Sequence, residues 1–302
     1  MNRRHKPRPQ NVLAGIGLVL AAVACFATLD TTTKFVSTGV PLLMALWFRY
    51  AFQAVATSLV VLPWRGLRVF KTNHPRYQLL RGLLLMCSTM LAFISLRHTP
   101  VAEFTAIVSL TPLVITVLAA YKLGEKVSAM RWLLVIGGFA GTLLIIRPDG
   151  NDFNWALLLP LALVGTSAWF QILTSKMART EDPITMHFYT GWVGTLVATT
   201  ALPFVWIQVD STALWGAMFI VGLAGTVGHF LLILAYQRTT AAVLTPYLYC
   251  QIGFAMLGGW LVFSQVPDSW SLIGIGMIAV CGAFGAWLTV RESQVRLEHV
   301  ES

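Results

Sequence analysis

Charged residues are scarce in this sequence of 302 residues, because aspartate, glutamate, lysine and arginine together make up only 11% of it. Hydrophobic residues make up 57%, and the mean hydropathy of +0.72 lies far outside the range of soluble globular domains. Long polar connections, in which a soluble domain could lie, are also missing. These absences exclude a soluble enzyme or binding module and predict a membrane protein that acts inside the bilayer.

Motifs for metal, disulfide and nucleotide chemistry are missing as well. The cysteines Cys25, Cys87, Cys250 and Cys281 stand alone without CxxC spacing, so the sequence predicts neither a zinc site nor a disulfide framework. No GxxxxGK[ST] phosphate loop is present, and the stretch GIGMIA lacks the third glycine of a dinucleotide-binding turn. We therefore expect no cofactor, no resident metal and no ATP hydrolysis by this chain.

Long apolar runs are what the chain does have. About 20 mostly apolar residues suffice to cross a bilayer core, and hydropathy on that scale predicts ten transmembrane helices. The chain is therefore expected to be an all-α membrane protein. The predicted spans are residues 12–33, 42–62, 78–96, 101–121, 131–147, 155–175, 184–206, 213–235, 242–264 and 270–290.

The ten spans divide into two similar blocks. The stretch KFVSTGVP aligns with KMARTEDP at an offset of 142 residues, and LRHTPVAEFT aligns with YQRTTAAVLT at an offset of 140. These stretches occupy corresponding places in residues 12–147 and 155–290, each of which holds five spans. Because five is odd, the second block must enter the membrane upside down. Such an inverted five-plus-five repeat is typical of secondary transporters with a midplane substrate site and alternating access.

Positive charges predict the orientation. Counted from an inside N-terminus, alternate connecting segments carry 17 lysines and arginines, whereas the intervening loops carry 3. Loops rich in these residues stay on the cytoplasmic side, so both the N-terminal tail, 1–11, and the C-terminal tail, 291–302, are expected to be cytoplasmic. The net charge of +9 then reflects orientation and contact with anionic lipid head groups, and we expect no nucleic-acid partner.

Arg49 carries a full charge within the apolar stretch MALWFRYAF of the second span. If the span begins near Pro41, eight residues place Arg49 roughly 12 Å below the outer surface. A charge at that depth is costly unless it is paired or hydrated, so it should face the bundle interior. We expect Asp30 or Glu103, at comparable depth, to be its partner. Two interpretations stay open: an ion pair that clamps helices, and a cavity-facing arginine that binds an anionic group of the substrate.

Polar side chains on one face of several predicted spans are further candidates. Thr105 and Ser109 lie four residues apart on the fourth span, and Thr245 and Tyr249 occupy the equivalent positions on the ninth. Such residues also let membrane helices approach and hydrogen-bond one another, which is the packing alternative for each of them. The candidate substrate-binding residues are Arg49, Thr89, Thr105, Ser109, Thr226, His229, Thr245 and Tyr249.

Several stretches resemble a known family. LDTTTKF, LWFRYAF, LLRGLLL, the long stretch from LRHTPVAEFT to LLIIRP, and the five-plus-five plan are similar to the EamA branch of the drug/metabolite transporter superfamily. The resemblance is sharper in the first half, since FSQVP stands in the second half where the first has the LGE of Glu125. It implies an inner-membrane carrier whose cavity is lined by spans 1, 3, 4, 6, 8 and 9. Members export amino acids, their derivatives or opine-type metallophores, or import S-adenosylmethionine or riboflavin.

We therefore predict a secondary transporter of a small metabolite, with membrane lipids as its surroundings. Export of a zwitterionic compound derived from an amino acid is favoured, and import of riboflavin, S-adenosylmethionine or a similar cofactor is the alternative. Transport is expected either to follow the gradient of the cargo or to exchange it for protons, with Asp30, Glu103 and His229 as the candidates for proton coupling. An intramembrane enzyme is a remote alternative, because no paired carboxylates, HExxH motif or Ser/His/Asp grouping marks a catalytic cluster.

Overall fold

The protein is described here by a computed structural model that is helical throughout the part it describes. The described residues are 12–111, 113–114, 129–146, 155–177, 180–238, 244 and 247–301. Ten α-helices lie in these residues, and each corresponds to one of the ten predicted spans, which confirms the predicted all-α class. The helices are α1 (Val12–Val36), α2 (Leu42–Arg65), α3 (Pro75–His98), α4 (Val101–Val108), α6 (Ala129–Ile146), α7 (Leu158–Met177), α8 (Pro183–Val205), α9 (Thr212–Arg238), α11 (Cys250–Phe263) and α12 (Ser269–Glu301).

Six segments are long and apolar enough to cross a membrane, and three shorter apolar helices accompany them. Many large apolar side chains on these segments point outward, as a lipid environment requires. The six long segments are Leu13–Val36, Leu42–Phe70, Pro75–His98, Trp155–Thr174, Pro183–Val205 and Thr212–Ala235. The three shorter helices are Trp132–Ile145, Cys250–Phe263 and Ser269–Gly285.

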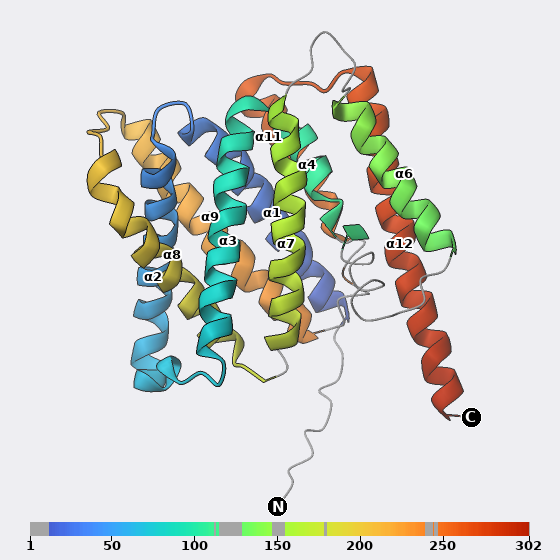
Figure 1. The fold of residues 1–302 in the computed structure, drawn as a ribbon, viewed down its shortest axis with the longest axis horizontal. Coiled ribbons are helices and arrows are strands. Elements are labelled where there is room, and N and C mark those ends of the chain that lie inside the picture. Colours follow the sequence, from blue (N-terminus) through green and yellow to red (C-terminus); the bar gives the residue numbers. More distant parts are fainter. Residues whose placement is uncertain are drawn as a thin grey trace, which may run out of the picture.

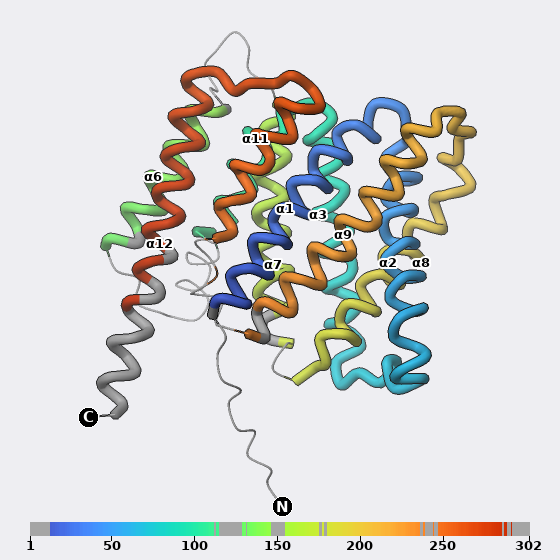
Figure 2. The backbone as a smooth tube through the Cα atoms, turned by 180° about the vertical axis from the view of Figure 1, so that it is seen from behind, coloured from blue at the N-terminus to red at the C-terminus, as the bar shows by residue number. Residues whose placement is uncertain are grey.

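The helices pair between the two halves of the chain. At one edge of the bundle α6 packs on α12, and at the opposite edge α2 packs on α8 (Figures 1 and 2). Between these edges, α1 packs on α9 just as its counterpart α7 packs on α3. The pair of α2 and α9 likewise matches the pair of α8 and α3, and the pair of α1 and α11 matches the pair of α7 and α4. Exchanging the two halves therefore reproduces the packing, which is the pattern of an inverted repeat.

Individual glycine contacts repeat in the same way. A side chain at Gly82 of α3 would meet Val193 of α8 at 2.6 Å, and one at Gly222 of α9 would meet Phe52 of α2 at 2.6 Å. Gly82 and Gly222 are 140 residues apart, and Phe52 and Val193 are 141 apart. Close approach between helices is thus made by glycine at equivalent places in both repeats, and the alignment offset that we inferred from the first and fourth spans holds in the second and third.

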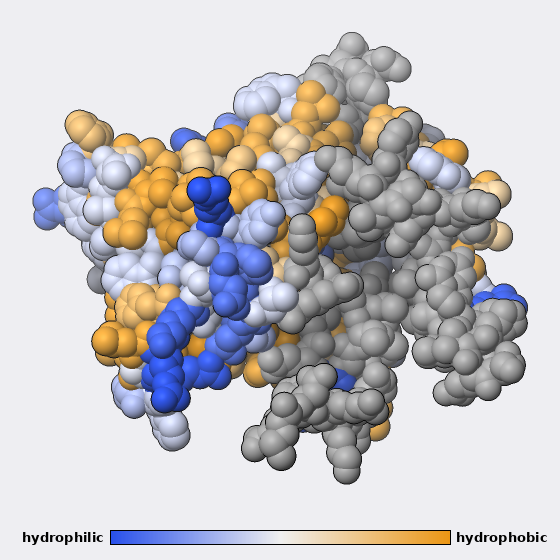
Figure 3. Space-filling model, turned by 60° about the horizontal axis from the view of Figure 1, so that its bottom comes forward, coloured by the Kyte–Doolittle hydropathy of each residue, from blue (hydrophilic) through white to orange (hydrophobic). Residues whose placement is uncertain are grey.

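Two ends of the bundle can be distinguished. The inner end is the one at which α1, α3 and α8 begin and α12 ends, at the bottom of Figure 1, and the outer end is the opposite one. Figure 3 turns the inner end toward the viewer and shows hydrophilic residues gathered between apolar flanks. The connection between α2 and α3 contributes exposed basic residues to this end, namely Arg65, Arg68 and Lys71. The inner end thus has the surface of a membrane–water boundary.

Local chemistry fixes where the helices of the inner end begin. Pro75 and Pro183 occupy the first turns of α3 and α8, where a missing backbone N–H costs little. The Asp182 side chain caps α8 by accepting a hydrogen bond from the backbone N of Thr185 at 3.3 Å. Glu181, 7% exposed, accepts hydrogen bonds from the backbone at the start of α3. The connection between α7 and α8 therefore holds the start of α3, and it sets the depth at which α3 side chains enter the bundle.

Candidate functional site

Arg49 lies inside the bundle, 6% exposed, as its position in the second span predicts. Its Nη1 donates a hydrogen bond to Oγ1 of Thr89 on α3, and its Nη2 lies 3.5 Å from Nε2 of His229 on α9. The guanidinium also lies 5.2 Å from the centre of the Tyr50 ring. Tyr50 in turn joins its hydroxyl to Thr89 Oγ1 at 2.9 Å. Helices α2, α3 and α9 therefore hold one arginine by neutral groups.

A second polar group surrounds Asp30 on α1. The Nε2 of Gln251 on α11 donates to Asp30 Oδ2 at 3.0 Å, and the Oγ1 of Thr105 on α4 donates to the same oxygen at 3.5 Å. Thr105 is 1% exposed, so this carboxylate is held in the interior by neutral donors from two other helices. The charges of Asp30 and Arg49 lie close enough to interact, although neither side chain is a hydrogen-bond partner of the other.

The two groups share one layer of the bundle. Asp30 lies six residues before the end of α1 and Arg49 seven residues after the start of α2, so each Cα is about 10 Å from the outer end. Thr89, which holds the guanidinium, lies nine residues before the end of α3, about 14 Å deep. The guanidinium thus points inward toward the midplane, the depth at which inverted-repeat transporters bind their substrates.

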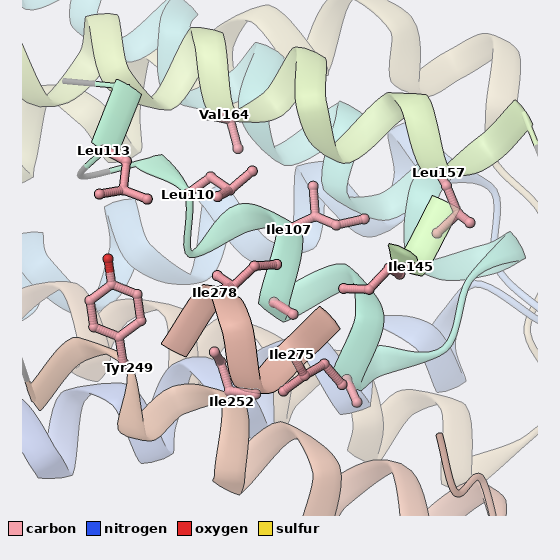
Figure 4. Packing of buried hydrophobic residues seen from close by; sticks show 12 residues of the cluster. Ile107, Leu110, Leu113, Ile145, Leu157, Val164, Tyr249, Ile252, Ile275 and Ile278 are labelled. Carbon is pink, nitrogen blue, oxygen red and sulfur yellow. The ribbon is translucent and has the colours of Figure 1, made fainter. Parts of the chain in front are cut away.

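The structure does not bring the remaining candidates into these groups. Ser109 and Thr226 each donate to the backbone carbonyl four residues earlier in their own helix. Tyr249 belongs to an apolar cluster between α4, α11 and α12, with its hydroxyl directed toward Leu113 (Figure 4). Glu103 lies in the first turn of α4 and lines a separate cavity of about 250 Å³ near the outer end. The candidate Thr245 lies outside the described residues.

Comparison with known proteins decides what such a bundle is. The model of the EamA-like transporter family matches residues 13–147 and again residues 154–288. The chain belongs to the EamA-like transporter family. It is a multi-pass membrane protein and a secondary transporter of small molecules, not an enzyme, and the two matches agree with the duplication in the helix packing.

Named relatives of this EamA-like transporter carry different cargoes. The S-adenosylmethionine uptake transporter of Rickettsia bellii is 29% identical over 267 residues, which are 87% of this chain and 90% of that protein. The riboflavin transporter of Vibrio cholerae is 27% identical over 98% of this chain and 99% of its own length. The pseudopaline exporter CntI of Pseudomonas aeruginosa is 26% identical, with coverages of 88% and 94%. A solved crystal structure shares the fold, with a TM-score of 0.65 at 18% identity and coverages of 92% and 98%.

Two expectations about charged groups of this EamA-like transporter are corrected. Among the described residues, Asp30 and Glu103 are not salt-bridge partners of Arg49, which is held by Thr89 and His229 instead. Lys34 does not lie at the interface, where a lysine beside the outer mouth was expected, but is 9% exposed. Its Nζ donates to the carbonyl oxygens of Leu96 and Thr99 at the C-terminal end of α3, where a positive charge is favourable.

The sequence analysis also missed a polar group nearer the inner end. Arg81 on α3 was counted among the positive charges of a cytoplasmic connection, yet it is 4% exposed. Gln53 on α2 lies one helical turn from Arg49, and its Nε2 lies 3.3 Å from Nδ1 of His187 on α8. The spacing of Arg49, Gln53 and the buried Thr57 along α2 is the signal that could have been used, because it forms one polar stripe on an apolar helix.

Proposed function

We propose that this protein carries a small zwitterionic metabolite derived from an amino acid, with Arg49 binding the carboxylate of the cargo. Asp30 binds its ammonium group. One observation carries the proposal: two buried side chains of opposite charge lie in one layer, each held by neutral partners and neither hydrogen-bonded to the other. A carboxylate can take two parallel hydrogen bonds from a guanidinium, and an ammonium group can donate to a carboxylate.

The free energy of burial favours a ligand that completes both charges. A charge within the bilayer core is costly unless it is compensated, and such charges usually serve a function. The hydroxyl of Thr89 and the amide of Gln251 compensate only part of the charge on Arg49 and Asp30. A zwitterion adds the missing counter-charges without changing the net charge of the membrane interior. Riboflavin has neither an ammonium nor a carboxylate group, so this pair of residues does not favour it as the cargo.

S-adenosylmethionine is the first cargo to test, since it carries an amino-acid group and the relatives of highest printed identity are named for its uptake. Export of another amino-acid derivative, the direction that we favoured from the sequence, uses the same two charges. We place the protein in a bacterial inner membrane with the inner end in the cytoplasm. The exposed basic residues of the connection between α2 and α3 support this orientation.

Transport in proteoliposomes tests the proposal. The purified full chain should move radiolabelled S-adenosylmethionine down its gradient, and Arg49→Gln and Asp30→Asn should each reduce that movement at least tenfold. The control is Arg65→Gln, because Arg65 is an exposed arginine paired with Asp182 at the inner end. Wild-type transport that survives in both variants would refute the assigned roles. Failure of wild-type protein to move S-adenosylmethionine, together with a different metabolite redistributed across expressing cells, would refute the cargo.

The same vesicles separate the two modes of energy coupling. If Asp30 carries a proton during exchange, an imposed pH gradient should drive cargo against its own gradient in wild-type protein but not in Asp30→Asn. Facilitated diffusion predicts that the pH gradient moves no cargo in either protein. Glu103→Gln provides a second comparison, because Glu103 lies nearer the outer end and lines a cavity of its own.

A further inference from the structure

Arg81 is a second buried arginine for which the proposed site gives no role. It lies six residues after the start of α3, about 9 Å from the inner end, and is 4% exposed. Its Nε donates to Oγ1 of Thr174 on α7 at 2.9 Å, and its Nη1 donates to Oγ1 of Thr190 on α8 at 2.6 Å and to the carbonyl of Met186 at 2.7 Å. Among the described residues, every hydrogen-bond acceptor of Arg81 is neutral.

A second observation points to a ligand at the same place. His187, one residue after Met186, is 4% exposed, and its Nε2 has no hydrogen-bond partner within the described part of the chain. Its Nδ1 faces Gln53 of α2 at 3.3 Å. The charge on Arg81 is close enough to act on the imidazole. A buried cation and a buried unsatisfied ring nitrogen therefore lie side by side, and buried polar atoms without partners are uncommon in folded proteins.

The internal symmetry relates Arg81 to Arg49. The residue of the second repeat that is equivalent to Arg49, at the offset of 141 set by Phe52 and Val193, is Thr190. Arg81 donates directly to Thr190. The interface of α3, α7 and α8, where Arg81 lies, is equivalent to the interface of α9, α1 and α2, where Arg49 lies. One guanidinium thus occupies each of two equivalent interfaces, although different helices supply it.

We propose that Arg81 forms an inner binding site for the carboxylate of the cargo, as the counterpart of the outer site at Arg49. The inference rests on the proposed function, since it needs a cargo with a carboxylate. In an inverted repeat the two equivalent interfaces exchange their open and closed states during alternating access. When the interface of α3, α7 and α8 opens toward the inner end, the planar fork of Arg81 can take two hydrogen bonds from a carboxylate. His187 Nε2 completes the site by bonding a polar atom of the same cargo.

Vesicles with the protein in one orientation test the two sites separately. In S-adenosylmethionine flux from the inner end, Arg81→Gln should raise the half-saturating concentration at least tenfold, and Arg81→Lys should recover part of the loss. Flux from the outer end should change less than threefold in Arg81→Gln, and Arg49→Gln should show the opposite pattern. Decarboxylated S-adenosylmethionine, which has no carboxylate, should be affected less than threefold by Arg81→Gln. Unchanged half-saturation from the inner end would overturn the site.

Thermal unfolding of the purified variants decides the question without reference to cargo. If Arg81 only ties α3 to α7 and α8, Arg81→Gln should unfold at a clearly lower temperature than wild type, by 5 °C or more. If Arg81 is a binding group held in readiness, Arg81→Gln should unfold at the wild-type temperature or above it, because a buried uncompensated charge is removed. The exposed Arg65→Gln is the matched control at the same end. Failure of wild-type protein to move S-adenosylmethionine would then refute the proposed cargo, while the unfolding temperatures still decide the role of Arg81.

Discussion

Thr89 on α3 and His229 on α9 lie at equivalent positions of the two repeats, 140 residues apart, and both contact the guanidinium of Arg49. One arginine from α2 is therefore held by both halves of the chain at once. In a protein whose halves move against each other, such a contact must change during transport. The Arg49 contacts join the outer half of the bundle to the machinery that we propose for cargo binding.

Thr89→Val should weaken transport without unfolding the protein. The substitution keeps the shape of the side chain but removes the oxygen that meets both Arg49 and the hydroxyl of Tyr50. Loss of a hydrogen bond to a charged group is worth roughly 1.5–3 kcal/mol, so we expect the half-saturating cargo concentration to rise by about one to two orders of magnitude. Concentration dependence of flux in proteoliposomes measures this. Thr200→Val is the control, because Thr200 is exposed and bonds only within α8.

Gly194→Ala should destabilise the fold through one identified clash. A Cβ at Gly194 of α8 would lie 2.4 Å from the ring of Tyr50, which is fully buried and tethered to Thr89. Because the ring cannot swing away, overpacking should cost about 1–3 kcal/mol and lower the unfolding midpoint in detergent by several degrees. Gly165→Ala on α7 is the matched control, since a Cβ there meets nothing within 4 Å. An equal loss in both variants would contradict the packing of α2 on α8.

Membrane orientation is tested by cysteine labelling. After Cys25, Cys87, Cys250 and Cys281 are replaced by alanine, a single cysteine at Ser211 should react with an impermeant maleimide in intact cells. A single cysteine at Thr180, exposed at the inner end, should react only after permeabilisation. Labelling of Thr180 in intact cells would reverse the proposed orientation while leaving the inverted repeat unaffected.

The ten helices and their duplication could be predicted because their signals are local. Runs of about 20 apolar residues and the prolines near Pro41 and Pro183 can be recognised without any knowledge of neighbours. The depth of Arg81 could not, because the same residue can reach the head groups or be buried, depending on acceptors such as Thr174 and Thr190 that other helices supply. Hydropathy averages over a span and therefore placed this charge in a connection.

The partner of Arg49 shows the same limit from the other side. Opposite charge and comparable depth pointed to Asp30 or Glu103, yet depth along each helix does not determine which faces meet. The side chains that do meet Arg49, Thr89 and His229, were already paired with each other by the repeat alignment. Symmetry therefore held information about the site that the pairing of charges did not.

Tyr249→Phe should stabilise the protein, and it decides whether Tyr249 belongs to the transport path. Its ring packs against Gly282 of α12 within an apolar cluster, and its buried hydroxyl has no hydrogen-bond partner among the described residues (Figure 4). Removing an unsatisfied buried hydroxyl should raise stability by about 1–3 kcal/mol, seen as a higher unfolding midpoint.

Tyr189→Phe is the contrasting variant, because the Tyr189 hydroxyl donates to the carbonyl of Phe70 at 2.9 Å and its loss should lower the midpoint slightly. Both variants should transport S-adenosylmethionine with wild-type half-saturation if these two hydroxyls lie off the path. A raised half-saturating concentration in Tyr249→Phe, with its midpoint unchanged or lowered, would mean that this hydroxyl meets cargo in another conformation. Tyr249 would then join Arg49 and Asp30 in the binding site, as its hydroxyl-bearing face of the ninth span first suggested.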